Sequence, residues 1–108
     1  MHRIEHYETS DGRDPIQEWL AKLRDKKARA IVLRRLDRLA AGNFGDHVFC
    51  RDGVWELRID LGPGYRVYYA LGNQSIIVLL CGGDKRKQQA DIERAVGFWR
   101  NIQRGGNH

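Results

Sequence analysis

The chain has 108 residues, 42% of them hydrophobic, and a formal net charge of +5. This length predicts one domain, residues 1–108, and the three Trp, four Tyr and three Phe exclude a disordered chain. The longest apolar run, residues 76–81, is too short for a membrane span, and no signal peptide opens the chain. Two cysteines, Cys50 and Cys81, make a disulfide framework improbable and favour a cytoplasmic protein. The histidines and cysteines lack metal-ligand spacing, so we expect neither a metal nor a cofactor.

The first half of the chain predicts a strand followed by two helices. Weak alternation over residues 2–8 favours a strand, and residues 9–13 read as a turn. Asp14 is placed to cap a helix that has Pro15 at its first position and Gln17 at the capping-box position. A second helix with its own apolar stripe follows almost at once and stops at Gly42. The short link predicts an antiparallel helix hairpin, and residues 43–53 are predicted to be a loop.

Residues 54–71 predict a β-hairpin with period-2 alternation on both arms. The apolar residues of the two arms lie on the same face only if the numbers of residues that face each other across the hairpin have an even sum. A three-residue loop at 62–64 meets this condition, and we expect Gly64 to adopt the left-handed conformation there. That register places Arg58 opposite Tyr68 and Asp60 opposite Arg66. The two arginines would then be diagonal neighbours on the face away from the core.

The last part of the chain predicts one more strand and one more helix. Residues 75–81 lack alternation, so this strand should be covered on both faces and lie inside the sheet. Gly82-Gly83-Asp84 should end it, a helix should run from Lys85 to about Gln103, and residues 104–108 should be a frayed tail. The predicted order is β-α-α-β-β-β-α: an α+β fold with an antiparallel-rich sheet, an N-terminal helix hairpin and a C-terminal helix.

The polar face of the hairpin is the candidate functional surface. It would carry Arg58, Arg66 and the phenol of Tyr68 beside Glu56 and Asp60. The alternative is a purely structural lattice of ion pairs. Exposed pairs of this kind contribute only about 0–1 kcal/mol, which is a weak reason to retain them.

Cations also gather at the predicted start of the last helix, where Lys85, Arg86 and Lys87 follow Asp84. Free backbone N–H groups at a helix start favour an anion, whereas each cation there opposes the helix dipole by about 0.3–1 kcal/mol. Three consecutive cations are therefore easier to understand if an anionic ligand binds. The alternative is an ordinary Asp-capped helix start with solvated lysines. The phosphate-binding P-loop spacing is absent.

Residues 20–40 carry eight basic side chains against two acidic ones. This distribution, and a sequence pI near 9.6, favours a surface that tracks phosphates, although a solvated helix exterior would look the same. The candidate contacts to a polyanion are Lys26, Lys27, Arg34, Arg35, Arg38 and, from the later cluster, Arg86.

Several blocks together resemble a known family. They are Pro15-x3-Trp19-Leu20, residues 42–46, residues 55–59, the Gly-Pro-Gly-Tyr-Arg block at 62–69, and Gly82-Gly83-Asp84-Lys85-x2-Gln88-x2-Asp91-Ile92. Over residues 3–100 the chain resembles the phage-derived, HigB-like killer proteins of the RelE/ParE toxin superfamily. The resemblance implies the toxin of a type II toxin–antitoxin pair. Its relatives cut mRNA at the ribosomal decoding site, and a cognate antitoxin, often a helix-turn-helix protein, holds them inactive.

The resemblance also implies roles for residues. Arg66 matches the family arginine on the scissile phosphate, with Arg58 as its partner, in a metal-independent endoribonuclease whose partners are the ribosome and mRNA. Lys85 and Lys87 are candidates for proton transfer. Relatives often have a Tyr or His near the start of the last helix, but residues 84–104 contain neither, so Tyr68 is a substitute candidate. Two alternatives stay open: a ParE-like inhibitor of DNA gyrase, and a non-catalytic RNA-binding module.

Overall fold

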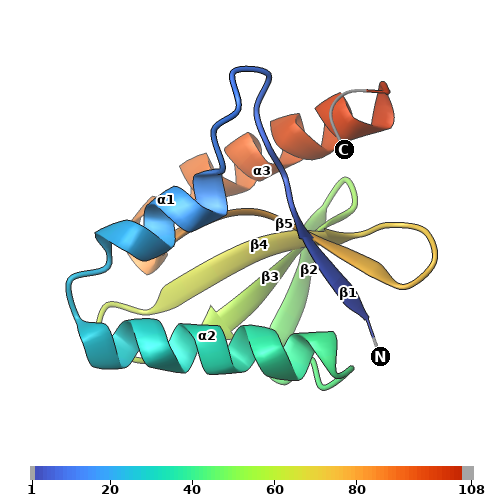
Figure 1. Ribbon diagram of the computed structural model, residues 1–108. Coiled ribbons are helices and arrows are strands. Elements are labelled where there is room, and N and C mark those ends of the chain that lie inside the picture. The colour runs from blue at the N-terminus through green and yellow to red at the C-terminus, as the bar shows by residue number, and fades with distance from the viewer. Residues whose placement is uncertain (1, 106–108) are drawn as a thin grey trace.

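A computed structural model describes residues 2–105. The strands are β1 (Arg3–His6), β2 (His47–Arg51), β3 (Val54–Ile59), β4 (Tyr65–Leu71) and β5 (Ile76–Asp84). The helices are α1 (Pro15–Lys22), α2 (Lys26–Ala40), the short 3-10 helix η1 (Lys85–Lys87) and α3 (Gln88–Gln103). Figure 1 shows these elements along the chain.

The five strands form one mixed sheet in the order β1-β5-β4-β3-β2. β1 pairs with β5 in parallel, and the other three pairs are antiparallel. The α+β class is therefore confirmed. The interior position predicted for the non-alternating last strand is confirmed as well, because β5 lies between β1 and β4.

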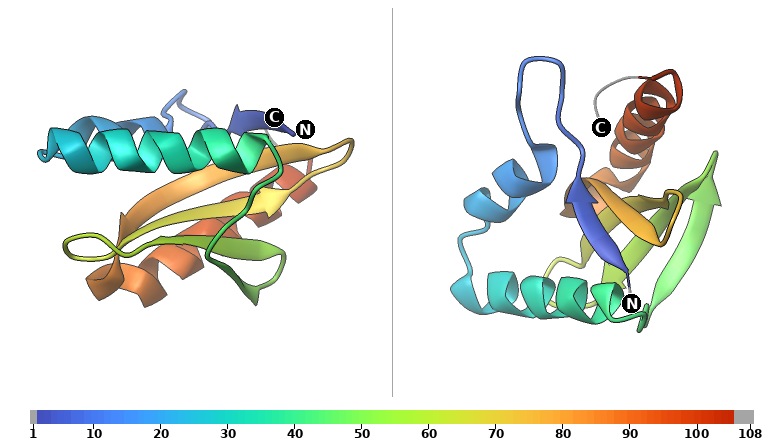
Figure 2. Two further views of the ribbon diagram at one scale, coloured as in Figure 1. Left: turned by 90° about the horizontal axis from the view of Figure 1, so that it is seen from below. Right: turned by 45° about the vertical axis from the view of Figure 1, so that its right-hand side comes forward.

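Helices cover both faces of the sheet, as the views of Figures 1 and 2 show. The helices α1 and α2 pack on one face through Ile16, Leu20, Val32 and Leu39, against strand residues such as Leu57 and Val67. On the other face, α3 packs through Ala95 and Val96 against Val54, Tyr68 and Leu80. The buried apolar side chains of the strands therefore fall into two clusters, according to the face that each occupies.

The first helix begins where the sequence predicts, at Pro15, and both helices begin with an aspartate cap. The Asp14 side chain accepts a hydrogen bond from the Gln17 N–H at 3.0 Å, and Asp25 accepts from the N–H groups of Lys27 and Ala28. These carboxylates satisfy N–H groups that the first helical turn leaves without partners. Residues 23–25 join α1 to α2, and the chain reverses direction there, as the short link predicts.

The prediction of a loop over residues 43–53 is wrong, because His47–Arg51 forms β2 at the edge of the sheet. The strand pairs with β3, and its register shifts between Phe49 and Arg51. This irregular pairing and the exposure of Val48 and Phe49 explain why the segment lacks clean alternation. Pairing with β3, rather than local patterning, makes it a strand.

The Gly82-Gly83-Asp84 stretch does not end the strand as predicted, because β5 continues through it and pairs with the start of β4. The backbone of Gly82 lies under the Trp19 ring, and Gly83 lies beside the Asp91 carboxylate. A Cβ atom at either glycine would overlap these side chains. The glycines therefore serve close packing on α1 and α3, not chain reversal.

The last helix also begins differently from the prediction. Residues 85–87 form a 3-10 turn, and α3 begins at Gln88. Its end at Gln103 is as predicted, with Arg104 and Gly105 still bonded to the carbonyls of the last turn. The frayed tail was predicted for 104–108, and residues 106–108 lie outside the described part. Within residues 2–105, no helix has the length and apolar character to cross a membrane.

Candidate active site

The candidate site forms where the end of β3, the start of β4 and the end of β5 meet. Arg58 pairs directly with Arg66 across β3 and β4, and Arg66 pairs with Gly83 of β5 on its other side. The predicted register, Arg58 opposite Tyr68, is wrong by two residues. Alternation constrains only parity, since a shift of two keeps every side chain on its face. The connecting loop is Asp60–Gly64, five residues instead of three, and Gly64 has the predicted left-handed conformation with φ +82°.

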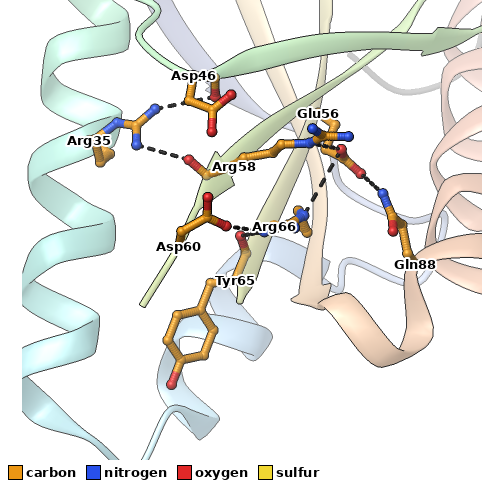
Figure 3. A network of polar contacts seen from close by, with 8 residues as sticks. All are labelled: Arg35, Asp46, Glu56, Arg58, Asp60, Tyr65, Arg66 and Gln88. Carbon is orange, nitrogen blue, oxygen red and sulfur yellow. Dashed lines mark hydrogen bonds and ion pairs between the residues drawn. The ribbon is translucent and has the colours of Figure 1, made fainter. Parts of the chain in front are cut away.

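A buried glutamate holds the two arginines together, as Figure 3 shows. Glu56 is almost fully buried and accepts hydrogen bonds from Arg58 Nε at 2.7 Å and from Gln88 Nε2 at 2.6 Å. The Nε atom of Arg66 lies 4.0 Å from the same carboxylate. Glu56 thus joins β3 to α3 by hydrogen bonds and makes a long ion pair with Arg66 of β4, whose Nε has no hydrogen-bond partner among the described residues. The sequence places Glu56 among the charged residues of this face but does not identify it as this centre.

The two arginines differ in exposure. The Arg66 side chain is 6% exposed, and its Nη1 donates to the Tyr65 carbonyl at 2.9 Å and lies 3.5 Å from Asp60 Oδ1. The Arg58 side chain is 37% exposed, and its one side-chain hydrogen bond within the described chain uses Nε. The hydrogen bond with Glu56 raises the pKa of Arg58, so this guanidinium stays charged. Arg58 therefore presents terminal N–H donors to solvent beside a nearly buried second cation.

Tyr68 does not lie on an open surface as predicted. The side chain is fully buried in the cluster under α3, and its hydroxyl has no hydrogen-bond partner among the described residues. Burial raises the pKa of Tyr68, with Glu56 adding to the effect. The face that the sequence leaves open is covered by α3, so this phenol has no path to a ligand in this conformation.

Lys85 and Lys87 are both exposed, but they border different hollows. The Lys85 N–H donates to the Gly64 carbonyl at 2.8 Å, which places Lys85 beside the β3–β4 loop next to Arg66. Lys87 borders a separate cavity formed with α1. Arg86, predicted to contact a polyanion, is 80% exposed and pairs with Asp84 at 3.0 Å, and this hydrogen bond lowers the pKa of Asp84.

The predicted polyanion-binding cations on α2 also divide into two kinds. Lys26, Lys27, Arg34 and Arg38 are exposed. Arg35 instead donates to the Arg58 carbonyl at 2.9 Å and lies 3.4 Å from the carbonyls of Phe44 and Asp46. Arg35 therefore ties α2 to the strand that carries Arg58, as Figure 3 shows, and the sequence does not indicate this role.

This arrangement suits the binding of a phosphate. Guanidinium groups offer forked N–H donors whose geometry matches phosphate oxygens. Asp60, the acidic neighbour of Arg66, has a 75% exposed side chain and only a long contact, so an incoming phosphate oxygen can replace it. Within residues 2–105, no group of three or more His, Cys, Asp and Glu side chains is arranged to hold a metal ion.

Comparisons with known proteins agree with the residue blocks. The family described as "Phage derived protein Gp49-like (DUF891)" matches residues 18–96, which include every candidate site residue. A protein of Haemophilus influenzae (strain ATCC 51907 / DSM 11121 / KW20 / Rd), described as uncharacterized, is 51% identical over 77 residues. This alignment covers 71% of the present chain and 78% of that protein. The chain therefore belongs to the phage-derived Gp49-like family, the HigB-like toxin family of the RelE/ParE superfamily.

Proposed function

We propose that this protein is the toxin of a type II toxin–antitoxin pair and acts in the cytoplasm as a ribosome-dependent mRNA endoribonuclease. The observation that carries the proposal is the pair of directly opposed arginines, Arg58 and Arg66, held by the buried Glu56 at the end of the sheet. Family membership supports the toxin class. An inhibitor of DNA gyrase would have no need of a phosphate-binding pair in this position.

The proposed reaction is attack of an RNA 2′-hydroxyl on the adjacent phosphorus. The 2′-oxygen gains a bond to phosphorus, the 5′-oxygen leaves with the bonding electrons, and the products are a 2′,3′-cyclic phosphate and a 5′-hydroxyl. Charge accumulates on the phosphate oxygens in the transition state, where Arg58 and Arg66 stabilise it. No metal is required.

The reaction also needs a base for the 2′-hydroxyl and an acid for the 5′-oxygen. Lys85 is the better placed of the two candidate lysines, because it lies beside Gly64 at the start of the strand that carries Arg66. Lys87 borders the cavity on the other side of β5 and is the second candidate. The burial of Tyr68 favours these lysines over its phenol.

The function is tested by inducing the protein in cells, mapping mRNA 5′ ends and following plasmid supercoiling. We expect growth arrest with new mRNA 5′ ends and unchanged supercoiling. Arg66→Lys keeps the charge beside Glu56 but loses the forked donor, so cleavage on purified ribosomes should fall by about 10²–10³. Arg100→Lys, an exposed site on α3, is the matched control and should cleave normally. Loss of supercoiling with intact mRNA would instead establish a gyrase inhibitor.

The partner is tested separately. We propose that a small open reading frame next to this one encodes a helix-turn-helix antitoxin. Co-expression of that neighbour should restore growth and co-purify with the toxin. If no adjacent open reading frame neutralises the arrest, this chain is not one half of a type II pair.

A further inference from the structure

A cavity of about 390 Å³ lies behind the candidate active site, between α1, the end of β5 and the start of α3. Its lining includes Trp19, Gly82, Gly83, Lys87 and Asp91. Gly83 is the strand partner of Arg66, so the cavity begins one strand away from the proposed phosphate site. The proposed reaction makes no use of Trp19 or Asp91.

Asp91 brings an unused hydrogen-bond acceptor to this cavity. The residue is 5% exposed, and its Oδ1 lies 3.3 Å from Arg94 Nη1. Its Oδ2 is buried beside Gly83 and has no partner among the described residues. A buried oxygen without a donor destabilises the protein, and more so when it is charged. A ligand that brings an N–H group would remove this cost.

The cations around the cavity differ in whether they are paired. Arg13 donates twice to Glu18 at 2.8 Å, and Arg94 pairs with Asp91. Lys22 and Lys87 also border the cavity, and neither forms a direct ion pair within residues 2–105. Lys22 favours the charged form of Glu18, and Lys87 favours the charged forms of Asp84 and Asp91, which also line the cavity. Two lysines without a direct ion pair at the rim of a cavity suit a phosphate group.

The cavity is also lined by an aromatic side chain, Trp19. The Trp19 ring packs on Gly82, where any side chain would overlap it, so the two glycines leave space for the ring and the carboxylate. Aromatic side chains are the usual surfaces against which proteins pack unpaired bases. An aromatic ring, a buried acceptor and rim lysines together match a nucleotide.

We propose that this cavity binds the nucleotide next to the scissile phosphate and selects its base, with a base N–H group donating to Asp91 Oδ2 and Lys22 and Lys87 near its phosphate. This inference rests on the proposed function, which supplies the RNA. It makes Asp91 a specificity-determining residue. Arg58 and Arg66 would bind the phosphate of any sequence, and the cavity would favour bases that offer an N–H donor at this position.

Binding is measured first by NMR, with 5′-AMP and 5′-CMP as probes and ribose 5-phosphate as the probe without a base. We expect the two nucleotides to shift the amide signals of Gly82 and Gly83 and the indole signal of Trp19, and to bind at least tenfold more tightly than ribose 5-phosphate. In Asp91→Asn the amide oxygen stays on Arg94 and the NH₂ group replaces the acceptor, so nucleotide affinity should fall about tenfold. Glu93→Gln, which removes an exposed carboxylate from the same helix, should bind normally.

A second variant avoids any effect on folding, because Lys22 is exposed. Lys22→Ala should weaken binding of 5′-CMP several-fold and leave binding of cytidine unchanged, whereas Arg24→Ala should alter neither. The proposal is overturned if nucleotides shift only signals around Arg58 and Arg66, or if Asp91→Asn binds them as the native protein does.

Maps of the mRNA cleavage sites then distinguish the proposed endoribonuclease activity from the proposed nucleotide cavity. They also show whether the cavity binds a nucleotide of the mRNA or a free nucleotide. Asp91→Asn should still cut mRNA but with a changed base preference beside the cut. If Asp91→Asn weakens nucleotide binding but leaves the base preference beside the cut unchanged, the cavity binds free nucleotides. That result would overturn the proposal that the cavity selects a base of the mRNA. Nucleotide binding in the cavity of a protein that cuts no RNA would refute the proposed endoribonuclease but not the cavity.

Discussion

Two adjacent tyrosines show how much a single hydroxyl depends on its surroundings. Tyr68 and Tyr69 are both fully buried and point to opposite faces of β4. The Tyr69 hydroxyl lies 3.1 Å from His47 Nδ1, whereas the Tyr68 hydroxyl has no partner among the described residues. An unpaired buried hydroxyl is a cost, and a paired one is a modest gain.

Tyr68→Phe should therefore raise the free energy of unfolding by about 1 kcal/mol, because it removes a polar group that burial leaves unsatisfied. Tyr69→Phe should lower it by about 1 kcal/mol, since it breaks the contact with His47. Urea unfolding of both variants checks this. Cleavage by Tyr68→Phe should be normal, and a loss of cleavage in a stable Tyr68→Phe protein would return the phenol to the proton-transfer candidates.

Two carboxylates near the end of β5 should give opposite pH dependence of stability. Burial raises the pKa of Asp91 above its ordinary 3.8, so the native state holds this proton more tightly than the unfolded state. The hydrogen bond from Arg86 lowers the pKa of Asp84 below 3.8. Stability linked to Asp91 is thus present below pH 3.8 and lost as the pH rises through the raised pKa. Stability linked to Asp84 is present above 3.8 and lost as the pH falls through the lowered pKa.

The free energy of unfolding, measured between about pH 3 and 7, checks both signs. The difference between native protein and Asp91→Asn should fall as the pH rises, and the difference for Asp84→Asn should rise. If both differences change in the same direction, the protonation assigned to Asp91 is wrong.

At the scale of elements, α2 combines two kinds of arginine. Arg34 and Arg38 are exposed, and Arg35 donates to strand and loop carbonyls. Only the exposed pair, Arg34 and Arg38, can therefore be replaced without removing contacts between α2 and the rest of the fold. Charged groups that donate to part-buried carbonyls contribute about 1.5–3 kcal/mol each.

Replacing Arg34 and Arg38 with Ala should weaken ribosome binding and make the slope of log affinity against log salt less steep by about 2, with stability changed by less than about 0.5 kcal/mol. Arg35→Ala should instead lower the free energy of unfolding by about 2 kcal/mol. Sedimentation with ribosomes across a salt series and urea unfolding measure the two effects. Unchanged affinity of the Arg34/Arg38 variant at every salt concentration would make α2 an ordinary solvated exterior.

At the scale of the molecule, the sheet lies between two apolar clusters, and its strands contribute side chains to both. Alternate residues of β4 enter different clusters: Val67 and Tyr69 face α1 and α2, and Tyr68 and Ala70 face α3. Leu39 is fully buried in the cluster under α1 and α2. The helices α2 and α3 lie on opposite faces of the sheet, as Figure 2 shows. Damage to either cluster should therefore reach the other through the backbone of the sheet.

Leu39→Ala should cost about 2–5 kcal/mol, and the chain should still unfold in one transition. The Trp19 indole signal reports on the α1 side and the Trp99 signal on the α3 side. NMR signals of both indoles should be lost at the same urea concentration. Two separate midpoints would show that the two layers fold as independent units.

Local patterns in the sequence predict most of the elements and place Arg58 and Arg66 on one face of the hairpin. Asp14, Pro15 and the helical stripes predicted α1 and α2, and the non-alternating run predicted the interior strand β5. Local signals suffice there because caps and periodicity act within a few residues. The strand β2 was missed because its conformation depends on pairing with β3.

By itself, then, the sequence determined the α+β class, the family, and the parity that places Arg58 and Arg66 on one face. Parity follows from the two-residue period of a strand, which needs no knowledge of distant segments. Only the tertiary structure decided the register that sets the two arginines directly opposite each other, because a shift of two residues preserves every local pattern. It also decided which polar residues of that face are buried, since the packing of α3 removes Tyr68 and Glu56 from solvent and leaves Arg58 accessible. Burial depends on which distant element covers a face, and no local pattern in β3 or β4 records that choice.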